Sequence, residues 1–315
     1  MKKLIILALC ALFAKVFLAQ TTNAGKVQVV TKLVQKTIPV QSSQNLKITA
    51  KKAKVMITPS SDNQIHLKMS LISKHTEKEK AEKDLQALAY EIGESNSEIT
   101  LKNEIQKDKV NEKITSLLKT VYEIQIPAQM PVKIHQNYGE IQIEKVKSNL
   151  NLNTNYTDIK LLDIHLDKAD IQNNYSDMEI KNCSGKYTVI SNYGDVKVRN
   201  TENMDFTGKI NYGDILLETF SGEVNITANY SDVKLENIKE IKRLNIVSNY
   251  SDVVFKDASS LNRYGFDIVN NFADVSIPET MRKDFVKSTN TLIKTASNGT
   301  PTIKIIANYG DINLK

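Results

Sequence analysis

Residues 192–217 read NYGDVKVRNTENMDFTGKINYGDILL and contain two copies of a short motif, which begin at Asn192 and Asn211. Each copy consists of Asn, Tyr, a small residue, an acidic residue and an aliphatic residue. Nine copies occur from Asn137 to the end of the chain, at intervals of 18 to 22 residues with a last interval of 37. Such regularity indicates a repeat protein. We interpret the last interval as two repeat units with one eroded copy.

Aliphatic and polar residues alternate on both sides of each motif. Val189 and Tyr187 precede Asn192 by three and five residues, while Val196 and Val198 follow it by four and six. This period of two predicts two short strands per repeat, each with one buried face. The inward positions are odd before the Asn and even after it, so the chain must slip by one residue within the motif, as a corner or bulge allows.

Two strands and a corner in 18 or 19 residues are typical of one coil of a parallel β-solenoid, in which coils lie about 4.8 Å apart. The sequence therefore predicts an all-β fold with a β-solenoid over residues 131–315. Residues 46–57 repeat the same offsets without the Asn, the Tyr or the acid, so the solenoid is expected to begin near Leu46.

The preceding residues, 20–130, are predicted to be β-rich and continuous with the solenoid. Apolar residues at helical spacing predict one short helix at about residues 75–92. Strands are predicted at Glu98–Leu101 and Val121–Ile126, with Lys102–Lys113 as a loop. The pattern fades between Pro278 and Pro301, where no element is predicted.

Residues 1–19 have the features of a secretory signal peptide. Lys2 and Lys3 precede an apolar run from Leu4 to Ala14, and cleavage after Ala19 or Ala24 fits the small residues there. Lys15 interrupts the run too early for a transmembrane helix. We expect an exported protein, in the periplasm, at the cell surface or outside the cell, with no transmembrane span in the mature chain.

The amino-acid composition argues against several classes of function. The net charge is +6 and falls to +3 without the three lysines of the leader, which is too small to indicate a nucleic-acid partner. Cys183 is the only cysteine beyond the leader, so an intrachain disulfide is excluded. The four His residues show no metal-binding spacing. We expect no catalytic residues, no cofactor and no enzymatic activity.

The Asn residues begin the corners, where backbone groups need partners. An Asn side chain can bond to such groups and to the Asn one coil away. We predict a structural ladder formed by Asn137, Asn155, Asn174, Asn192, Asn211, Asn229, Asn249, Asn271 and Asn308.

The Tyr residues are predicted to stack at the spacing of the coils. Because Tyr shares the parity of the inward residues of the first strand, packing inside the solenoid is favoured. Outside, the rings would form a platform for sugars or for a partner protein. The residues of this possible binding stripe are Tyr138, Tyr156, Tyr175, Tyr193, Tyr212, Tyr230, Tyr250 and Tyr309, with Phe272 in the ninth copy.

The acidic residues are expected to line one edge of the solenoid. Each carboxylate would accept hydrogen bonds from its own turn backbone, or the row would bind Ca²⁺ between coils. The first interpretation is favoured, because the Gly-rich nonapeptide of calcium-binding β-rolls is absent. A catalytic pair needs carboxylates in different environments, which a regular row does not provide. The Ca²⁺ candidates are Asp158, Asp177, Asp195, Asp214, Asp232 and Asp252.

The NYGD and NYSDVKL units, the Ser-Gly turns at Ser184 and Ser221 and the segment TIPVQSSQNLKITAKKAKVMI resemble the exported bacterial putative-adhesin family of β-strand repeats. The resemblance covers roughly Ile38 to Lys315 and implies a right-handed β-helix and an extracytoplasmic location. It carries no catalytic or binding residues over to this chain, because the adhesin name rests on analogy of fold.

We expect a non-enzymatic protein that presents a regular face to a glycan or an envelope protein, as an adhesin or envelope interaction protein. One alternative is a polysaccharide-acting β-helix enzyme, with its site in Lys102–Lys113 or Pro278–Pro301. The other is a periplasmic spacer or a partner in envelope-stress signalling.

Overall fold

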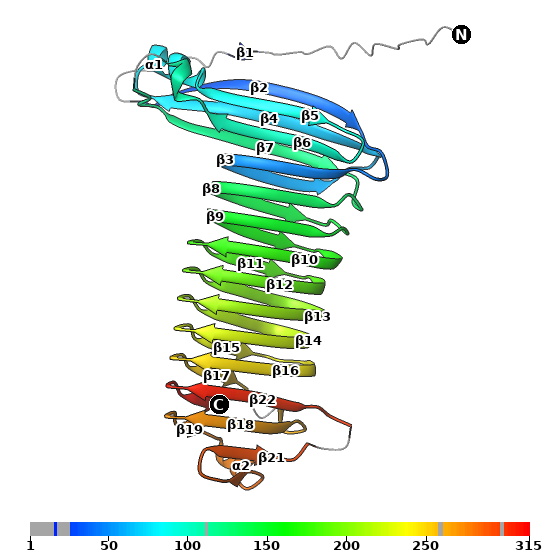
Figure 1. The fold of residues 1–315 in the computed structure, drawn as a ribbon, viewed down its shortest axis with the longest axis vertical. Helices are drawn as coiled ribbons and strands as arrows, with labels where there is room; N and C mark the ends of the chain where they lie inside the picture. The colour runs from blue at the N-terminus through cyan, green and yellow to red at the C-terminus, as the bar shows by residue number, and fades with distance from the viewer. Residues whose placement is uncertain (1–15, 18–25, 111–112, 258–260, 297–298) are drawn as a thin grey trace, which may run out of the picture.

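The computed structural model describes residues 16–17, 26–110, 113–257, 261–296 and 299–315. The predicted signal peptide, residues 1–19, therefore lies outside the described residues except for β1 (Val16–Phe17), which pairs antiparallel with β2 (Gln28–Pro39). The described chain is an elongated stack of strands that is broader at its N-terminal end (Figure 1). All-β architecture is confirmed, since only short helices interrupt the strands.

Each coil gives one strand segment to each of two sheets. We call the first sheet the one formed by segments before the Asn-Tyr corner, and the second sheet the one formed by segments after it. Neighbouring coils pair in parallel, and each motif lies on the next, as Asn137 lies opposite Asn155. The strands of these coils are β8 (Val132–Glu144), β9 (Leu150–Leu162), β10 (His165–Asn174), β11 (Met178–Lys181), β12 (Ser184–Asn192), β13 (Val196–Asn211), β14 (Ile215–Asn229) and β15 (Val233–Glu236).

The core runs along the inside of the stack. Inward aliphatic residues such as Ile134, Val189 and Val198 have no exposed surface. Burying each such side chain stabilises the fold by about 1.5–3 kcal/mol. Cys183 also lies in this core at 1% exposure, and burial raises the pKa of its thiol.

The solenoid begins where the degenerate copy predicts. β3 (Asn45–Pro59) pairs in parallel with β8, with Leu46 opposite Val132 and Lys51 opposite Asn137. The offsets of residues 46–57 therefore correspond to a real first coil. Lys52 takes the position of the Tyr and shares its left-handed backbone, at φ 50°.

The N-terminal region extends both sheets beyond β3. β4 (Gln64–His75) and β7 (Leu117–Ile126), together with β2, continue the second sheet. β5 (Leu88–Glu94) and β6 (Glu98–Ile105) continue the first sheet. Pairing is antiparallel here except where β6 and β7 join β3, so this end forms a cap on the parallel stack.

Two sequence predictions in this region are wrong in their bounds. The helix predicted at about residues 75–92 is only α1 (Lys78–Leu85), because Leu88–Glu94 pairs with β6 as a strand and this tertiary pairing overrides the helical spacing. The predicted loop Lys102–Lys113 includes the end of β6 and a 3₁₀ turn at Lys107–Lys109.

The last coil is out of sequence order in the stack. β22 (Thr302–Asn308) pairs in parallel with β16 (Glu240–Asn249) on one side and with β18 (Gly265–Asn271) on the other. β23 (Ile312–Leu314) likewise lies between β17 (Val253–Lys256) and β19 (Val275–Ser276). Figure 1 shows β22 in red between the yellow β16 and the orange β18.

The interval of 37 residues is therefore not two units with one eroded copy. After β19 the chain forms α2 (Glu279–Arg282), β20 (Val286–Lys287) and β21 (Thr291–Lys294). β21 pairs antiparallel with β18 and closes this end of the stack, and the chain then returns to insert its last coil.

Candidate functional site

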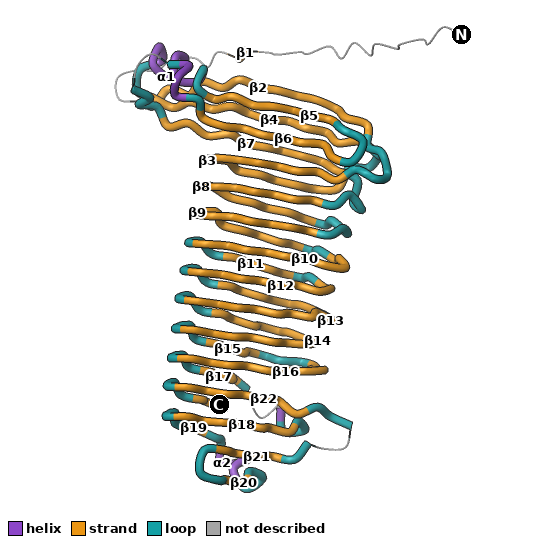
Figure 2. Tube along the Cα trace, in the orientation of Figure 1, coloured by secondary structure: helices purple, strands orange, loops and turns teal. Residues whose placement is uncertain are grey.

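The corners of the coils lie above one another along one edge of the solenoid, visible as a column of loops on the left of Figure 2. The residue that causes the slip in parity is the Tyr. Its backbone is left-handed in every copy, with φ between 51° at Tyr156 and 64° at Tyr138. Because the extra residue is the Tyr itself, its side chain points outward, and the predicted packing of the rings inside the solenoid is wrong.

The rings form one continuous ladder along this edge, which we call the Tyr ladder: Tyr138, Tyr156, Tyr175, Tyr193, Tyr212, Tyr230, Tyr250, Tyr309 and Phe272, in spatial order. Neighbouring ring centroids are 4.8 to 5.1 Å apart, and the planes differ by at most 8°. The Tyr residues are 46–53% exposed. The ring planes are nearly parallel, but the distance between neighbouring centroids is greater than the contact distance of two rings stacked face to face. The rings are therefore stacked with an offset, which is the favoured geometry for aromatic pairs.

The left-handed backbone does not require an aromatic residue. At the opposite edge of the stack the turns also place one residue in this conformation, and there the chain uses residues such as Asn182, Asn200 and Asn237. Asn is a common choice in the left-handed region, whereas a bulky residue there is an outlier. The Tyr ladder is thus maintained against the local preference of the backbone, at a cost of about 1–3 kcal/mol per strained residue.

The Asn side chains form a second row beside the rings. The Nδ2 atom of Asn192 donates to Oδ1 of Asn174 at 2.7 Å, and Oδ1 of Asn192 accepts from Nδ2 of Asn211 at 2.7 Å. The same bond links each consecutive pair from Asn137 to Asn249, then Asn308 and finally Asn271. This arrangement holds adjacent corners together, with one N–H donor and one acceptor position of each inner amide in use.

The Asp side chains form a third row, and they bond differently from the prediction. Oδ1 of Asp195 accepts the backbone N–H of Asp214 at 2.9 Å, so the donor belongs to the next coil and not to the turn of the same coil. The bond recurs between Asp177 and Asp195 and along the row as far as Asp274. In each of these pairs one carboxylate oxygen thereby stabilises the stack, and the second oxygens of Asp214 and Asp232 are paired with Lys234.

The structure gives the Ca²⁺ hypothesis no support. Within the part of the chain that the structure describes, no group of three or more His, Cys, Asp or Glu residues is arranged to hold a metal ion. The six Asp candidates lie in one file at the spacing of the coils, and Oδ1 of several of them is already bonded to a backbone N–H. Ca²⁺ needs six to eight oxygen ligands around one point, which a single file does not supply.

The chemistry that this edge offers is hydrogen bonding with an excess of negative charge. Among the described residues, no hydrogen bond engages a hydroxyl of the Tyr ladder. In the described part of the chain, Lys234 is the one basic residue paired with the Asp row, at 3.0 Å from Asp214 and 4.0 Å from Asp232, and its bond to Asp214 raises the pKa of the ammonium. The faces of the inner rings are covered by their neighbours, so the edge presents ring rims, hydroxyls and carboxylates.

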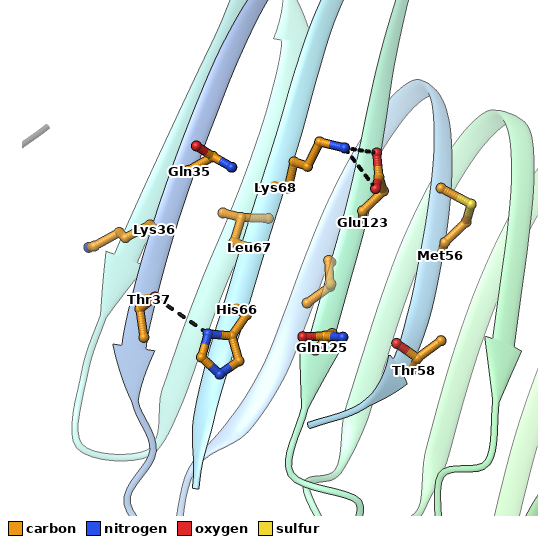
Figure 3. Close-up of a pocket in the computed structure, with 11 residues that line it drawn as sticks. Gln35, Lys36, Thr37, Met56, Thr58, His66, Leu67, Lys68, Glu123 and Gln125 are labelled. Carbon is orange, nitrogen blue, oxygen red and sulfur yellow. Dashed lines mark hydrogen bonds and ion pairs between the residues drawn. The ribbon is translucent and has the colours of Figure 1, made fainter. Parts of the chain in front are cut away.

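A hollow on the outer surface of β2, β4, β7 and β3 is a second candidate (Figure 3). His66 Nε2 lies 3.0 Å from Asp62 Oδ1, and His66 Nδ1 lies 3.5 Å from the Thr37 hydroxyl. This order is reminiscent of a nucleophile with its base and orienting acid. The strands around it pair in regular ladders, antiparallel among β2, β4 and β7 and parallel between β7 and β3, so their backbone N–H groups are engaged with neighbouring strands.

Together, the fold and its edge define a class of protein: a parallel β-solenoid repeat protein with continuous side-chain ladders. The chain belongs to the Toastrack DUF4097 family, whose model matches residues 43–315. No curated protein matches it. Neither helix of the described residues is long and apolar enough to cross a membrane.

Several solved structures are similar to this chain, and three of them follow. A putative cell adhesion protein from Clostridium sporogenes is 12% identical, with 92% of this chain and 99% of that chain covered and a TM-score of 0.24. A putative lipid binding protein from Parabacteroides distasonis is 12% identical, with coverage of 92% and 97% and a TM-score of 0.35. A putative adhesin from Bacteroides fragilis is 14% identical, with coverage of 90% and 97% and a TM-score of 0.28.

Proposed function

We propose that the chain is an exported, non-enzymatic, right-handed β-solenoid of the cell envelope that binds a linear glycan along the edge formed by the Tyr ladder and the Asp row. The observation that carries the proposal is the uninterrupted Tyr ladder at strained backbone positions. The opposite edge makes turns of the same backbone conformation without aromatic residues, so a role beyond the turn itself accounts for the rings.

The chemistry of the edge favours a polymer rich in hydroxyl groups. Hydroxyls of the glycan donate to the free carboxylate oxygens of the Asp row, and they exchange hydrogen bonds with the Tyr hydroxyls. One set of these groups recurs with every coil, about every 4.9 Å, which suits an extended ligand with a regular repeat. Many weak contacts along one chain add up to useful affinity, because each further contact is made within the same complex.

The charge of the edge restricts the class of glycan. A row of carboxylates with a single lysine partner repels uronic acids and sulfated sugars and tolerates neutral or amino-bearing ones. Because the inner ring faces are covered, recognition along the ladder depends on hydrogen bonds to ring rims and hydroxyls. Stacking of sugars on ring faces does not contribute there.

The test is affinity electrophoresis through gels that contain either a neutral β-glucan or polygalacturonate. The triple variant Tyr193→Phe/Tyr212→Phe/Tyr230→Phe keeps the rings and the stacking but removes three hydroxyls. A matched control, Asn200→Gly/Asn237→Gly, changes the opposite edge at positions where Gly adopts the same backbone.

We expect the wild-type protein and the control to be retarded by the neutral glucan and the triple variant to be retarded less. Polygalacturonate should retard none of them. Equal retardation of the wild-type protein and the triple variant would refute binding through the ladder. Retention by envelope proteins alone, with no glycan effect, would instead favour the signalling or spacer role.

A further inference from the structure

The two ends of the Tyr ladder differ. At the N-terminal end the stack continues into β3, where Lys52 takes the position equivalent to Tyr138. Glu140, in the acidic position of that coil, is ion-paired with Lys54 at 3.0 Å and with Lys119 at 3.8 Å. A further coil therefore covers this end of the Tyr ladder, and the two lysines neutralise the carboxylate of Glu140.

At the other end the ladder finishes in a bare ring. Phe272 is 81% exposed, compared with 46–53% for the Tyr residues, and among the described residues one ring, that of Tyr309, stacks on it at 5.0 Å and 6°. It occupies this terminal place only because the last coil inserts between Asn249 and Asn271. The single ring without a hydroxyl thus stands at the spatial end of the ladder, although in the sequence it lies between Tyr250 and Tyr309.

The Asp row and the Asn row also end in the corner that carries Phe272. Asp274 is the last residue of the Asp row: its N–H donates to Asp311, but its own carboxylate accepts no hydrogen bond from a described residue. Asn290 lies one step beyond Asn271, with its Nδ2 atom 3.4 Å from Asn271 Oδ1, so the Asn row extends one member further than the rings. An apolar face therefore lies beside a carboxylate and an amide at the end of the stack.

We propose that Phe272, Asp274 and Asn290 form a terminal subsite in which the apolar face of a sugar ring stacks on Phe272 while its hydroxyls bond to Asp274 and Asn290. A pyranose ring combines one apolar CH face with a polar rim, which matches this set of groups. The subsite rests on the proposed glycan function, since it would hold the end of the same ligand. Phe272 is the most exposed ring of the ladder, which favours stacking at this end.

The chain contains no Trp, so the fluorescence of a Trp introduced at this subsite reports on that position alone. The variant Phe272→Trp introduces a single indole at the terminal face, and Tyr193→Trp introduces one inside the ladder as a matched control. Phe272→Ala removes the stacking face. Since Phe272 is 81% exposed and packs against one ring only, its removal is expected to leave the fold intact.

Binding of cellohexaose and chitohexaose is measured by calorimetry and by Trp fluorescence. We expect Phe272→Ala to weaken binding about fivefold to tenfold, the loss of one aromatic contact. Either oligosaccharide should shift the emission of Phe272→Trp to shorter wavelength, and the emission of Tyr193→Trp should change much less. Asp274→Asn should also weaken binding while leaving the emission shift of Phe272→Trp in place.

The outcomes separate the two proposals. If the oligosaccharides bind wild type and Phe272→Ala equally well, and the indole at position 272 does not respond, the terminal subsite is refuted while binding along the ladder stands. If neither oligosaccharide binds the wild-type protein, both the glycan function and the subsite are refuted.

Discussion

Tyr250 and Tyr309 lie 59 residues apart in the sequence, yet their rings stack at 4.9 Å with planes 5° apart. This contact exists because the last coil of the chain inserts between two coils that precede it in the sequence. The continuity of the Tyr ladder, and with it the candidate binding edge, therefore depends on the C-terminal 14 residues. Without them β18 and its cap would have no parallel neighbour on the side of β16.

Deleting residues 302–315 should unfold the end of the stack but spare the rest. Coils contact only their neighbours, so residues 132–229 are expected to keep their protection while residues 265–294 lose theirs. Hydrogen exchange measured by mass spectrometry distinguishes the two regions, with Tyr309→Phe as a control that preserves the stack. Unchanged protection of residues 265–294 in the truncated chain would contradict the inserted position of the last coil.

The Asn row should contribute measurably to stability. Asn192→Ala removes one bond to Asn174 and one from Asn211 and leaves their amide groups without these partners. We expect a loss of about 1–3 kcal/mol in the free energy of unfolding. Urea denaturation measures it, and Asn153→Ala is the control, because that exposed side chain has a single bond of 3.5 Å. Equal effects of both substitutions would count against the stabilising role of the row.

Gly139 should tolerate no side chain. A Cβ atom there would lie 1.8 Å from the carbonyl oxygen of Ala53 in the neighbouring coil, and its φ of +143° is unfavourable for other residues. Gly139→Ala is expected to cost about 3 kcal/mol. Gly93→Ala, whose nearest contact would be 3.8 Å, should change stability by less than about 1 kcal/mol. Thermal denaturation of both variants is decisive, and similar melting temperatures would show that this corner is looser than the structure indicates.

Asp84 links α1 to the start of β7 and should make stability depend on pH. Burial disfavours its charged form, but the Ser116 and Thr115 N–H groups, at 2.8 and 3.0 Å, outweigh burial and lower the pKa of Asp84 below its ordinary value of 3.8. Because the pKa is lower in the folded state, its stabilising effect is complete above pH 3.8 and is lost as the pH falls through the lowered value.

Asp84→Ala is therefore expected to lower the free energy of unfolding by about 1–3 kcal/mol at neutral pH, because it removes the carboxylate partner of the buried Ser116 N–H and of the more exposed Thr115 N–H. The difference from wild type should shrink in acid. Urea denaturation at pH 7 and at pH 3 measures this change. If the difference in the free energy of unfolding between wild type and Asp84→Ala were the same at pH 7 and at pH 3, the charge of the Asp84 carboxylate would not contribute to its contact with the start of β7.

Much of the fold follows from the repeat alone. Inward residues such as Val189 and Val196 recur in every coil at fixed offsets, and because strands alternate faces, the offsets define the two sheets and their register. The degenerate first coil is recognisable for the same reason, since Leu46 and Val55 keep the offsets even where the Asn and Tyr are lost.

Three features are not determined by the repeat. Parity shows that one residue of the motif is extra but not which one, and the outward Tyr depends on a left-handed backbone that aromatic residues rarely adopt. The stacking order cannot be predicted from the motif, because the copies at Asn271 and Asn308 both supply an Asn, an aromatic ring and an Asp. The strand Leu88–Glu94 exists only because β6 lies beside it, which local spacing does not reveal.

Nuclear magnetic resonance of the protein with ¹³C-labelled Tyr rings tests the central claim most directly. The chain has 12 Tyr residues, eight in the Tyr ladder, while Tyr122, Tyr187 and Tyr264 are buried elsewhere. Adding cellohexaose is predicted to shift the ring resonances of the ladder and to leave those of the three buried residues unchanged, whereas hexagalacturonate should shift none. Ladder resonances that do not move at saturating cellohexaose, or shifts confined to Tyr residues outside the ladder, would contradict the assignment of this edge as the glycan-binding surface.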